Sequence, residues 1–289
     1  EYADFKRIPV QTYEEIKEYV DRMRHGEKDI LWPGQVSWYA KSSGTTNDKS
    51  KFIPVSKEGL QKVHYAGGRD SVALYLQNNP DSRLFSGKAL ILGGSHAPNY
   101  NLKHSLVGDL SAILIENINP VVNLIRVPKK EIALLSDFEE KMEKIARIAM
   151  NQDITNISGV PSWMLAVIKR VMELKGTDNL AEVWPNLEIF FHGGVAFTPY
   201  REQYQQIIRS SNMHYMETYN ASEGFFGIQN DPTDPSMLLM IDYDVFYEFI
   251  PMDEFDTPDP QIVPLWEVEL NKNYAMVIST SCGLWRYII

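Results

Sequence analysis

Cysteine, long hydrophobic runs and positive charge are all scarce in this chain of 289 residues. The single cysteine, Cys282, excludes a disulfide within the chain and is typical of a reducing compartment, so we expect a cytoplasmic protein. The longest apolar runs, such as residues 160–168, are about half as long as a membrane-spanning helix, so no membrane partner is expected. The 28 basic residues against 38 acidic ones give a net charge of −10, which argues against nucleic acid as a partner.

The length and composition indicate one large globular domain or two unequal ones. Hydrophobic residues make up 44% of the chain and charged residues 23%, which is enough apolar material to fill a core. The chain begins at Glu1 rather than at a methionine, and it stops in an apolar stretch with no turn or cap after it. We therefore expect one domain over residues 1–289 that is incomplete at both ends.

Helical and strand periodicities alternate in the first part of the chain. Thr12 and Glu15 form a capping box that predicts a helix to about residue 26. Further helices are predicted after Ser56 to about residue 77 (with Gly67-Gly68 as a potential break), at 106–118, after a capping box at Ser136 to about 150, after Ser162 to about 175, and at 200–210. Strands are predicted at 36–40, 52–55, 88–92, 187–191 and 213–218, then at 237–241, 245–250, 275–279 and 284–289. This order predicts an α/β fold with mixed sheets flanked by helices and a more antiparallel C-terminal part.

The most informative segment is the polar loop at residues 42–51. It contains two serines, a glycine and two threonines in a row, followed by Lys49 and Lys51. Hydroxyls and backbone N–H groups of such a loop can wrap the oxygens of a polyphosphate, and a lysine can add positive charge. A P-loop kinase or NTPase is disfavoured, because here the lysines lead into a strand instead of a helix. On composition alone, a plain polar hairpin turn explains the loop equally well.

Two further segments come directly after predicted strands. Gly193 and Gly194 would let a flat ligand lie against the backbone, although a simple turn also explains them. In the predicted loop 219–224, Tyr219 offers an aromatic face for stacking, and Glu223 offers a carboxylate of the kind that holds Mg²⁺ beside phosphates. A core aromatic and a solvated loop acid are the alternative interpretations of these two residues.

Together, these segments resemble the motifs of a known family. Residues 42–46 (Ser-Ser-Gly-Thr-Thr) with a downstream lysine resemble the phosphate loop of the adenylate-forming superfamily of acyl-CoA synthetases, luciferases and peptide-synthetase adenylation domains. Their combination with residues 221–224 (Ala-Ser-Glu-Gly) and 283–287 (Gly-Leu-Trp-Arg-Tyr) is similar to the auxin-responsive promoter family, which comprises plant acyl acid amido synthetases and bacterial relatives. The resemblance runs from residue 36 to the last residue. It implies a large N-terminal adenylation domain, with the family's small C-terminal domain absent.

The resemblance also implies roles for individual residues. Those that would contact the ATP phosphates are Ser42, Ser43, Gly44, Thr45, Thr46 and Lys51. The adenine would be lined by Gly193, Gly194 and Val195 and stacked on Tyr219. Ser222 would lie near the α-phosphate, Glu223 would bind Mg²⁺, and Arg286 would belong to the third nucleotide-binding motif. The implied catalytic residues are Lys51 and Glu223, and the implied cofactors are ATP and Mg²⁺.

The implied reaction activates a small carboxylic acid. Its carboxylate attacks the α-phosphate of ATP, pyrophosphate leaves, and an amine such as an amino acid then displaces AMP from the acyl-adenylate. The protein supplies positioning and fixed positive charge rather than a nucleophile, so Cys282 is interpreted as a packed small hydrophobe. Residues 93–96 and 160–164 are candidates for the acyl pocket. An acyl-CoA ligase, with a thiol as the second nucleophile, and a non-catalytic nucleotide-binding relative remain the alternatives.

Overall fold

A seven-stranded mixed sheet forms the centre of the computed structural model, which describes residues 2–42 and 50–289. From one edge to the other its strands are β10 (Leu238–Leu239), β9 (Gly224–Ile228), β8 (His214–Ala221), β7 (Ile189–Gly193), β6 (Ile154–Gly159), β3 (Lys88–Ile91) and β5 (Arg126–Val127). The strands from β5 to β8 pair in parallel, whereas β9 and β10 are antiparallel additions. The carboxyl ends of the parallel strands therefore lie along one edge of the sheet.

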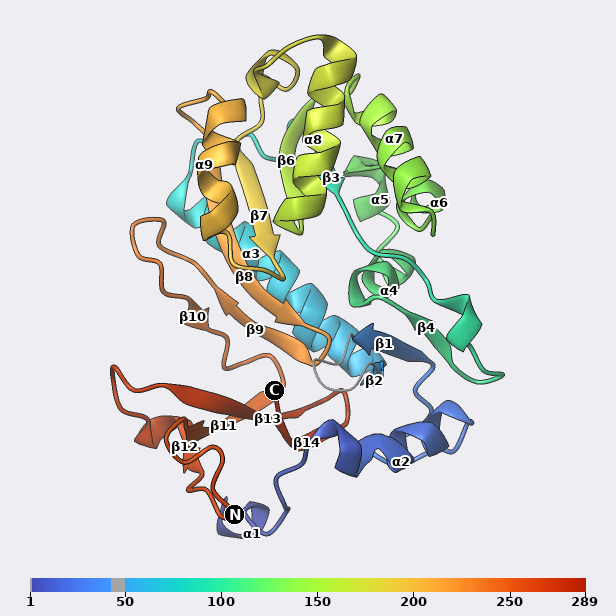
Figure 1. Cartoon of the computed structure of the whole chain (residues 1–289), viewed down its shortest axis with the longest axis vertical. Helices are drawn as coiled ribbons and strands as arrows, with labels where there is room; N and C mark the ends of the chain where they lie inside the picture. The colour runs from blue at the N-terminus through green and yellow to red at the C-terminus, as the bar shows by residue number, and fades with distance from the viewer. Residues whose placement is uncertain (1, 43–49) are drawn as a thin grey trace.

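Helices cover both faces of this sheet (Figure 1). One face is covered by α7 (Phe138–Ala149), α8 (Pro161–Lys175) and α9 (Thr198–Ile207), and the other by α3 (Tyr65–Asn78). Ile189 and Phe190, which are neighbours on β7, belong to separate buried clusters on these two faces. This is the expected result of a strand that alternates its side chains and is buried on both sides.

Two smaller sheets complete the fold. The first contains β2 (Lys51–Val55), β1 (Trp38–Ser42) and β4 (Leu106–Gly108). The second is entirely antiparallel and contains β12 (Val263–Pro264), β11 (Val245–Pro251), β13 (Tyr274–Thr280) and β14 (Leu284–Ile288). The remaining helices are α1 (Tyr2–Phe5), α2 (Tyr13–Arg24), the π-helix η1 (Gly59–His64), α4 (Leu110–Asn117), α5 (Val122–Ile125) and α6 (Lys130–Ala133), with 3₁₀ turns at Pro98–Tyr100, Leu180–Glu182 and Leu265–Glu267. The predicted α/β class, with its antiparallel C-terminal part, is confirmed.

Several predicted boundaries were wrong. The helix predicted over residues 106–118 is divided, because its first residues form β4 beside β1 and the helix begins only after Asp109. The N-cap of α7 is Asp137, whose carboxylate accepts from the Glu140 N–H at 2.7 Å, and not Ser136. Ser162 does not cap α8, since Pro161 is already its first residue.

The helix predicted after Ser56 does not break at its glycine pair. It begins as the π-helix η1 and continues as α3 through Gly67 and Gly68. A Cβ at Gly67 would lie 2.3 Å from the Phe225 ring, so this glycine allows α3 to pack closely on β9. Within the ranges that the structure describes, no helix is both long enough and apolar enough to cross a membrane.

Candidate active site

The two glycines at the end of β7 lie beside β8 at the carboxyl edge of the central sheet. Gly193 pairs with Thr218, and a Cβ on Gly193 would lie only 2.5 Å from the Thr218 carbonyl oxygen. Gly194 has a φ of +83°, which favours glycine, and both Gly194 and Val195 are exposed. The backbone here offers a bare surface at the edge where open α/β sheets bind ligands.

The segment predicted as a loop over residues 219–224 is a β-hairpin. β8 continues through Tyr219 to Ala221, and β9 starts at Gly224, because the two strands pair in antiparallel fashion up to the turn. The register shifts between Tyr219 and Asn220. Tyr219 is 43% exposed and its ring contacts Phe226 edge-on, so one aromatic face is available to a ligand. The partly exposed Ser222 and the buried Glu223 form the turn itself.

Glu223 is the buried acid at this hairpin turn, only 7% exposed. Burial raises the pKa of its carboxyl, and the charge of Lys51 lowers it. Across the described parts of the chain, no side chain donates a hydrogen bond to this carboxylate or forms an ion pair with it. Burial raises the pKa values of Tyr219 and Tyr287, and the charge of Glu223 raises both further, so each of these tyrosines lies within electrostatic reach of Glu223.

Lys51 belongs to the strand pair that carries the predicted phosphate loop. Ser42 ends β1 and lies opposite Lys51, the first residue of β2. The Lys51 ammonium is 6.0 Å from the centre of the Tyr13 ring, and the Tyr13 hydroxyl accepts from the Phe52 N–H at 2.9 Å. The predicted phosphate-binding residues Ser43, Gly44, Thr45 and Thr46 lie outside the described residues, as does Lys49.

Two tyrosines at this site were missed by the sequence analysis. Tyr13 opens α2, and the charge of Glu223 reaches Tyr287 on β14. Gln11 forms a parallel bridge with Tyr287, since its N–H donates to the Arg286 carbonyl and its carbonyl accepts from the Ile288 N–H, both at 2.9 Å. Tyr287 could have been identified from the sequence because it is the last residue of the motif at 283–287, but nothing in the sequence indicated Tyr13.

Arg286 is directed to other partners. Its buried guanidinium pairs with Glu248 at 2.8 Å and donates to the carbonyl oxygens of Lys6 and Ile8. It also has a φ of +44°, within the left-handed region. These contacts tie β14 to β11 and to the N-terminal segment. The nucleotide role of Arg286 stays a prediction.

The structure also describes Cys282 and the two segments predicted to line the acyl pocket. Cys282 is buried, as the interpretation as a packed residue predicts, and burial raises the pKa of its thiol to about 11. Val160, at the start of the predicted acyl-pocket segment, adjoins Gly194, where an added Cβ would lie 3.4 Å from a Val160 methyl group. In the other segment, the Gly93 and Gly94 carbonyls accept from the buried Lys141 ammonium, each at 2.8 Å.

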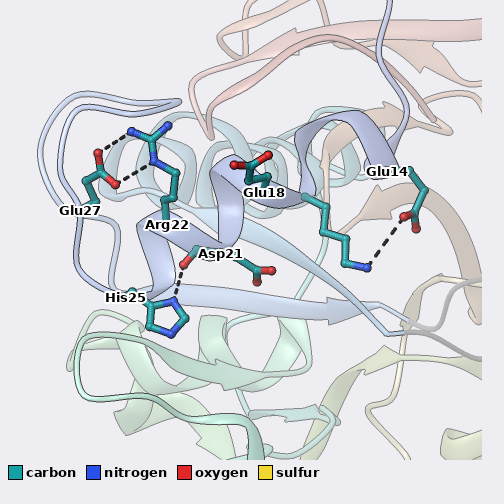
Figure 2. Close-up of a pocket in the computed structure, with 7 residues that line it drawn as sticks. Glu14, Glu18, Asp21, Arg22, His25 and Glu27 are labelled. Carbon is teal, nitrogen blue, oxygen red and sulfur yellow. Dashed lines mark hydrogen bonds and ion pairs between the residues drawn. The ribbon is translucent and has the colours of Figure 1, made fainter.

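A charged groove on α2 contains none of the predicted site residues (Figure 2). Its lining consists of Glu14, Lys17, Glu18, Asp21, Arg22, His25 and Glu27. Its charges largely pair with one another, as in the contacts of Arg22 with Glu27 at 2.5 Å and of Lys17 with Glu14 at 3.8 Å. We interpret it as a solvated helix face.

The Glu223 carboxylate is better suited to Mg²⁺ than to a metal ion that takes all of its ligands from protein side chains. No cluster of three or more His, Cys, Asp or Glu side chains that could hold a metal occurs in the part of the chain that the structure describes. Mg²⁺ in phosphate-transfer sites is typically bound by one or two carboxylates, with water and substrate phosphates completing its shell. A single buried carboxylate without a side-chain partner is compatible with that arrangement.

Comparisons with known proteins agree with the motifs. Residues 1–213 match the GH3 family N-terminal domain, and residues 238–289 match the GH3 family central domain. Indole-3-acetic acid-amido synthetase GH3.3 of Arabidopsis thaliana is 22% identical over 97% of this chain and 57% of its own length. The 4-substituted benzoates-glutamate ligase GH3.12 of the same plant is 23% identical over 97% of this chain and 58% of its own. The chain thus spans just over half the length of these curated relatives.

Solved structures show the same fold. AtGH3.15 acyl acid amido synthetase in complex with 2,4-DB superposes with a TM-score of 0.81 at 18% identity, over 100% of this chain and 59% of that one. A 2-hydroxyisobutyryl-CoA ligase in complex with 2-HIB-AMP reaches a TM-score of 0.62 at 11% identity, over 99% of this chain and 53% of that one. The family resemblance inferred from the three motifs is confirmed: this chain belongs to the GH3 family.

Proposed function

We propose that this chain is the adenylation portion, over residues 1–289, of a ligase that uses ATP and Mg²⁺ to activate a carboxylic acid as its acyl-adenylate. The acyl group would then be transferred to an amine. The observation that carries the proposal is the electrostatic interaction between Lys51 on β2 and Glu223 in the β8–β9 turn, which belong to separate sheets. We propose a cytoplasmic setting because the one thiol is free and buried.

The residues divide the work between binding and charge stabilisation. The adenine would lie against the bare backbone of Gly193 and Gly194 beside Val195, with the exposed face of Tyr219 stacked on it. Ser42 and Lys51 lie opposite each other in the β1–β2 pair, on either side of the sequence segment that includes Ser43, Gly44, Thr45 and Thr46. These groups would hold the triphosphate, and the Lys51 ammonium would offset the negative charge that develops as pyrophosphate departs.

Glu223 would hold the cation at the α-phosphate, with the Ser222 hydroxyl beside it. When bound, Mg²⁺ would supply charge neutralisation at the phosphate oxygens. Because Glu223 is buried and has no side-chain partner among the described residues, its carboxylate would be available to a cation. The attacking group is the carboxylate of the acid substrate, which bonds to the α-phosphorus while the bond to pyrophosphate breaks. The protein needs no nucleophile of its own for this step.

An amine is the second substrate that the family favours. The curated relatives are named as amido synthetases and as a glutamate ligase, whereas the likeness to the CoA ligase, at 11% identity, is one of fold. The acyl-CoA ligase and the non-catalytic relative therefore rank below the amido synthetase. Acceptor assays that compare amino acids with CoA distinguish the two ligases directly.

The test is carboxylate-dependent exchange of labelled pyrophosphate into ATP by the full-length protein, across a library of aryl and alkyl acids. At least one acid should support exchange, and hydroxylamine should trap the acyl-adenylate as a hydroxamate. Lys51→Met should lower the exchange rate roughly 10²-fold, as expected for the loss of one charge-stabilising group. Exposed Lys57, just beyond β2, gives a matched control, and Lys57→Met should exchange at the wild-type rate. If none of the acids in the library supports pyrophosphate exchange, the ligase proposal is refuted.

A further inference from the structure

The buried imidazole of His64 lies beneath the hairpin that carries Glu223. His64 is the last residue of the π-helix η1 and is 3% exposed. Its Nδ1 is 3.1 Å from the Oδ1 atom of Asn220 on β8. Its Nε2 is buried and has no hydrogen-bond partner in the described chain. Burial lowers the pKa of this ring to about 4, so it is neutral at pH 7.

A neutral imidazole has one N–H, and the geometry decides where it lies. The Asn220 Oδ1 atom can only accept, so the proton belongs on Nδ1 of His64. Asn220 stands at the register shift between β8 and β9, where an irregular pairing redirects side chains and increases the local twist. The hydrogen bond therefore acts at the point in the hairpin where strand pairing alone determines the geometry least.

The helix that carries His64 also contacts the hairpin between β13 and β14. The Ser56 hydroxyl, just before η1, donates to the Ser281 carbonyl at 2.6 Å. Gly59 packs so closely on Cys282 that a Cβ there would lie 2.3 Å from Sγ. One helical segment thus contacts both the turn that bears Glu223 and the strand pair that bears Tyr287, and π-helical turns are frequent at functional sites.

The buried position of the His64 ring does not favour the stability of the fold. A buried ring nitrogen without a hydrogen bond loses its solvation, and a leucine or phenylalanine at this depth would avoid that loss. Among the residues that the structure describes, the one polar side chain within hydrogen-bond distance of this ring is Asn220, which belongs to the hairpin of the candidate active site.

We propose that His64 is a positioning residue for the adenylation step, which it serves by holding Asn220 and with it the turn of Ser222 and Glu223. This inference rests on the proposed function, because it concerns the same site. His64 does not touch the substrates itself. Its effect should therefore appear in turnover and in the order of the hairpin more than in the affinity for the acid.

Two matched substitutions separate a positional role from simple loss of packing. In His64→Asn the side-chain Nδ2 can take the place of Nδ1 and keep a donor toward Asn220, whereas in His64→Gln the amide falls at the ε position. His64→Asn should keep the exchange kcat within about threefold of wild type, and His64→Gln and His64→Leu should lower it about tenfold with little change in the KM for the acid. Equal losses in all three variants would overturn the proposal.

A double-mutant cycle with Asn220→Ala tests whether the two residues act through each other. If they do, His64→Leu and Asn220→Ala will each lower kcat about tenfold and the double variant will lower it by about the same factor. Losses that multiply to about a hundredfold would show independent effects and would refute the pairing.

Two measurements do not depend on catalysis. The ¹⁵N chemical shifts of His64 in the wild-type protein should show a protonated Nδ1 and an unprotonated Nε2, and the opposite tautomer would overturn the assignment. Hydrogen exchange of the amides at residues 221–224 should accelerate about tenfold in His64→Leu and remain near the wild-type rate in His64→Asn. If no acid supports pyrophosphate exchange but the ¹⁵N shifts and the amide hydrogen exchange are as expected, the proposed function fails while the positioning of the hairpin by His64 stands. Unchanged amide exchange in His64→Leu would refute the positioning whatever the activity.

Discussion

Lys51, the first residue of β2, lies close enough to Glu223 for its charge to oppose the rise in pKa that burial causes in that carboxyl. The two residues are 172 positions apart in the sequence, and they belong to different sheets. Burial therefore makes ionisation of Glu223 costly, and the Lys51 ammonium opposes that cost. A buried acid with this combination of neighbours is typical of a functional site.

Glu223→Gln should be more stable and less active than the wild-type protein. A carboxyl whose pKa is raised by folding stabilises the fold when protonated, and that contribution is lost as pH rises through the folded pKa. At pH 7.5 the amide removes the cost of a buried charge, so the free energy of unfolding in urea should rise, while pyrophosphate exchange should fall roughly 10²-fold. Glu18→Gln, at an exposed position in the solvated α2 groove, is the control and should change neither. An active Glu223→Gln protein would remove this residue from the catalytic site.

His192 should make the protein sensitive to acid. Both of its ring nitrogens are buried and form no hydrogen bond with any residue that the structure describes. Its ring stacks on Phe197 with the ring centres 4.0 Å apart, and burial lowers its pKa from 6.5 to about 3. A lowered histidine pKa means that the unfolded chain binds the proton first, so stability falls as pH drops below 6.5. We expect His192 to account for a loss of about 2 kcal/mol between pH 6.5 and pH 5.

The measurement is urea unfolding at both pH values in wild type and in His192→Phe. The variant should lose about 2 kcal/mol less than wild type over this interval, whereas His25→Gln, an exposed histidine on the α2 groove, should behave as wild type does. Identical pH slopes in wild type and His192→Phe would contradict the assignment.

Tyr13→Phe should weaken the strand that carries Lys51. The Tyr13 hydroxyl accepts from the Phe52 N–H, and removing it leaves that part-buried donor without its partner. We expect a loss of about 1 kcal/mol in the free energy of unfolding and a lower affinity for ATP. Tyr19→Phe provides the control, because this tyrosine is 43% exposed on the same helix and should change neither value. Equal stability of the two variants would show that the Tyr13 contact contributes nothing.

The glycine pair of α3 should respond in opposite directions to alanine. At Gly67 a Cβ would meet the Phe225 ring at 2.3 Å, so Gly67→Ala should destabilise the protein by about 2 kcal/mol. At Gly68 no atom lies within 4 Å of the added Cβ, so Gly68→Ala should stabilise it by about 0.8 kcal/mol through helix propensity. Thermal unfolding of the two variants tests this, and a stabilising Gly67→Ala would contradict the packing of α3 on β9.

Local signals predicted the elements well and their boundaries less well. The alternation of strands and helices, and the antiparallel C-terminal part, follow from periodicity and turn residues. The helix predicted over 106–118 failed at its start because a parallel strand, β4, is stabilised by a distant neighbour that no local pattern reveals. The same reason explains Tyr219, which is exposed like a loop residue but belongs to a strand paired with β9.

The candidate site shows the same division. Gly193, Gly194, Tyr219 and Glu223 could be found because each follows a predicted strand in a recognisable motif. Tyr13 could not be found, since its role depends on how α2 packs on β2, and packing is invisible in a single sequence. Arg286 was assigned to the nucleotide from its motif, whereas its geometry depends on Glu248 from another strand.

The bridge between Gln11 and Tyr287 has a practical consequence for experiments on this protein. The backbone ahead of α2 lies against β14, so a purification tag or reporter inserted at that point would disturb the strand that carries Tyr287. An insertion of the same size in the largely exposed turn at residues 253–259 would leave this bridge intact. Loss of activity in a fusion of the first kind should therefore be compared with the second before it is attributed to misfolding.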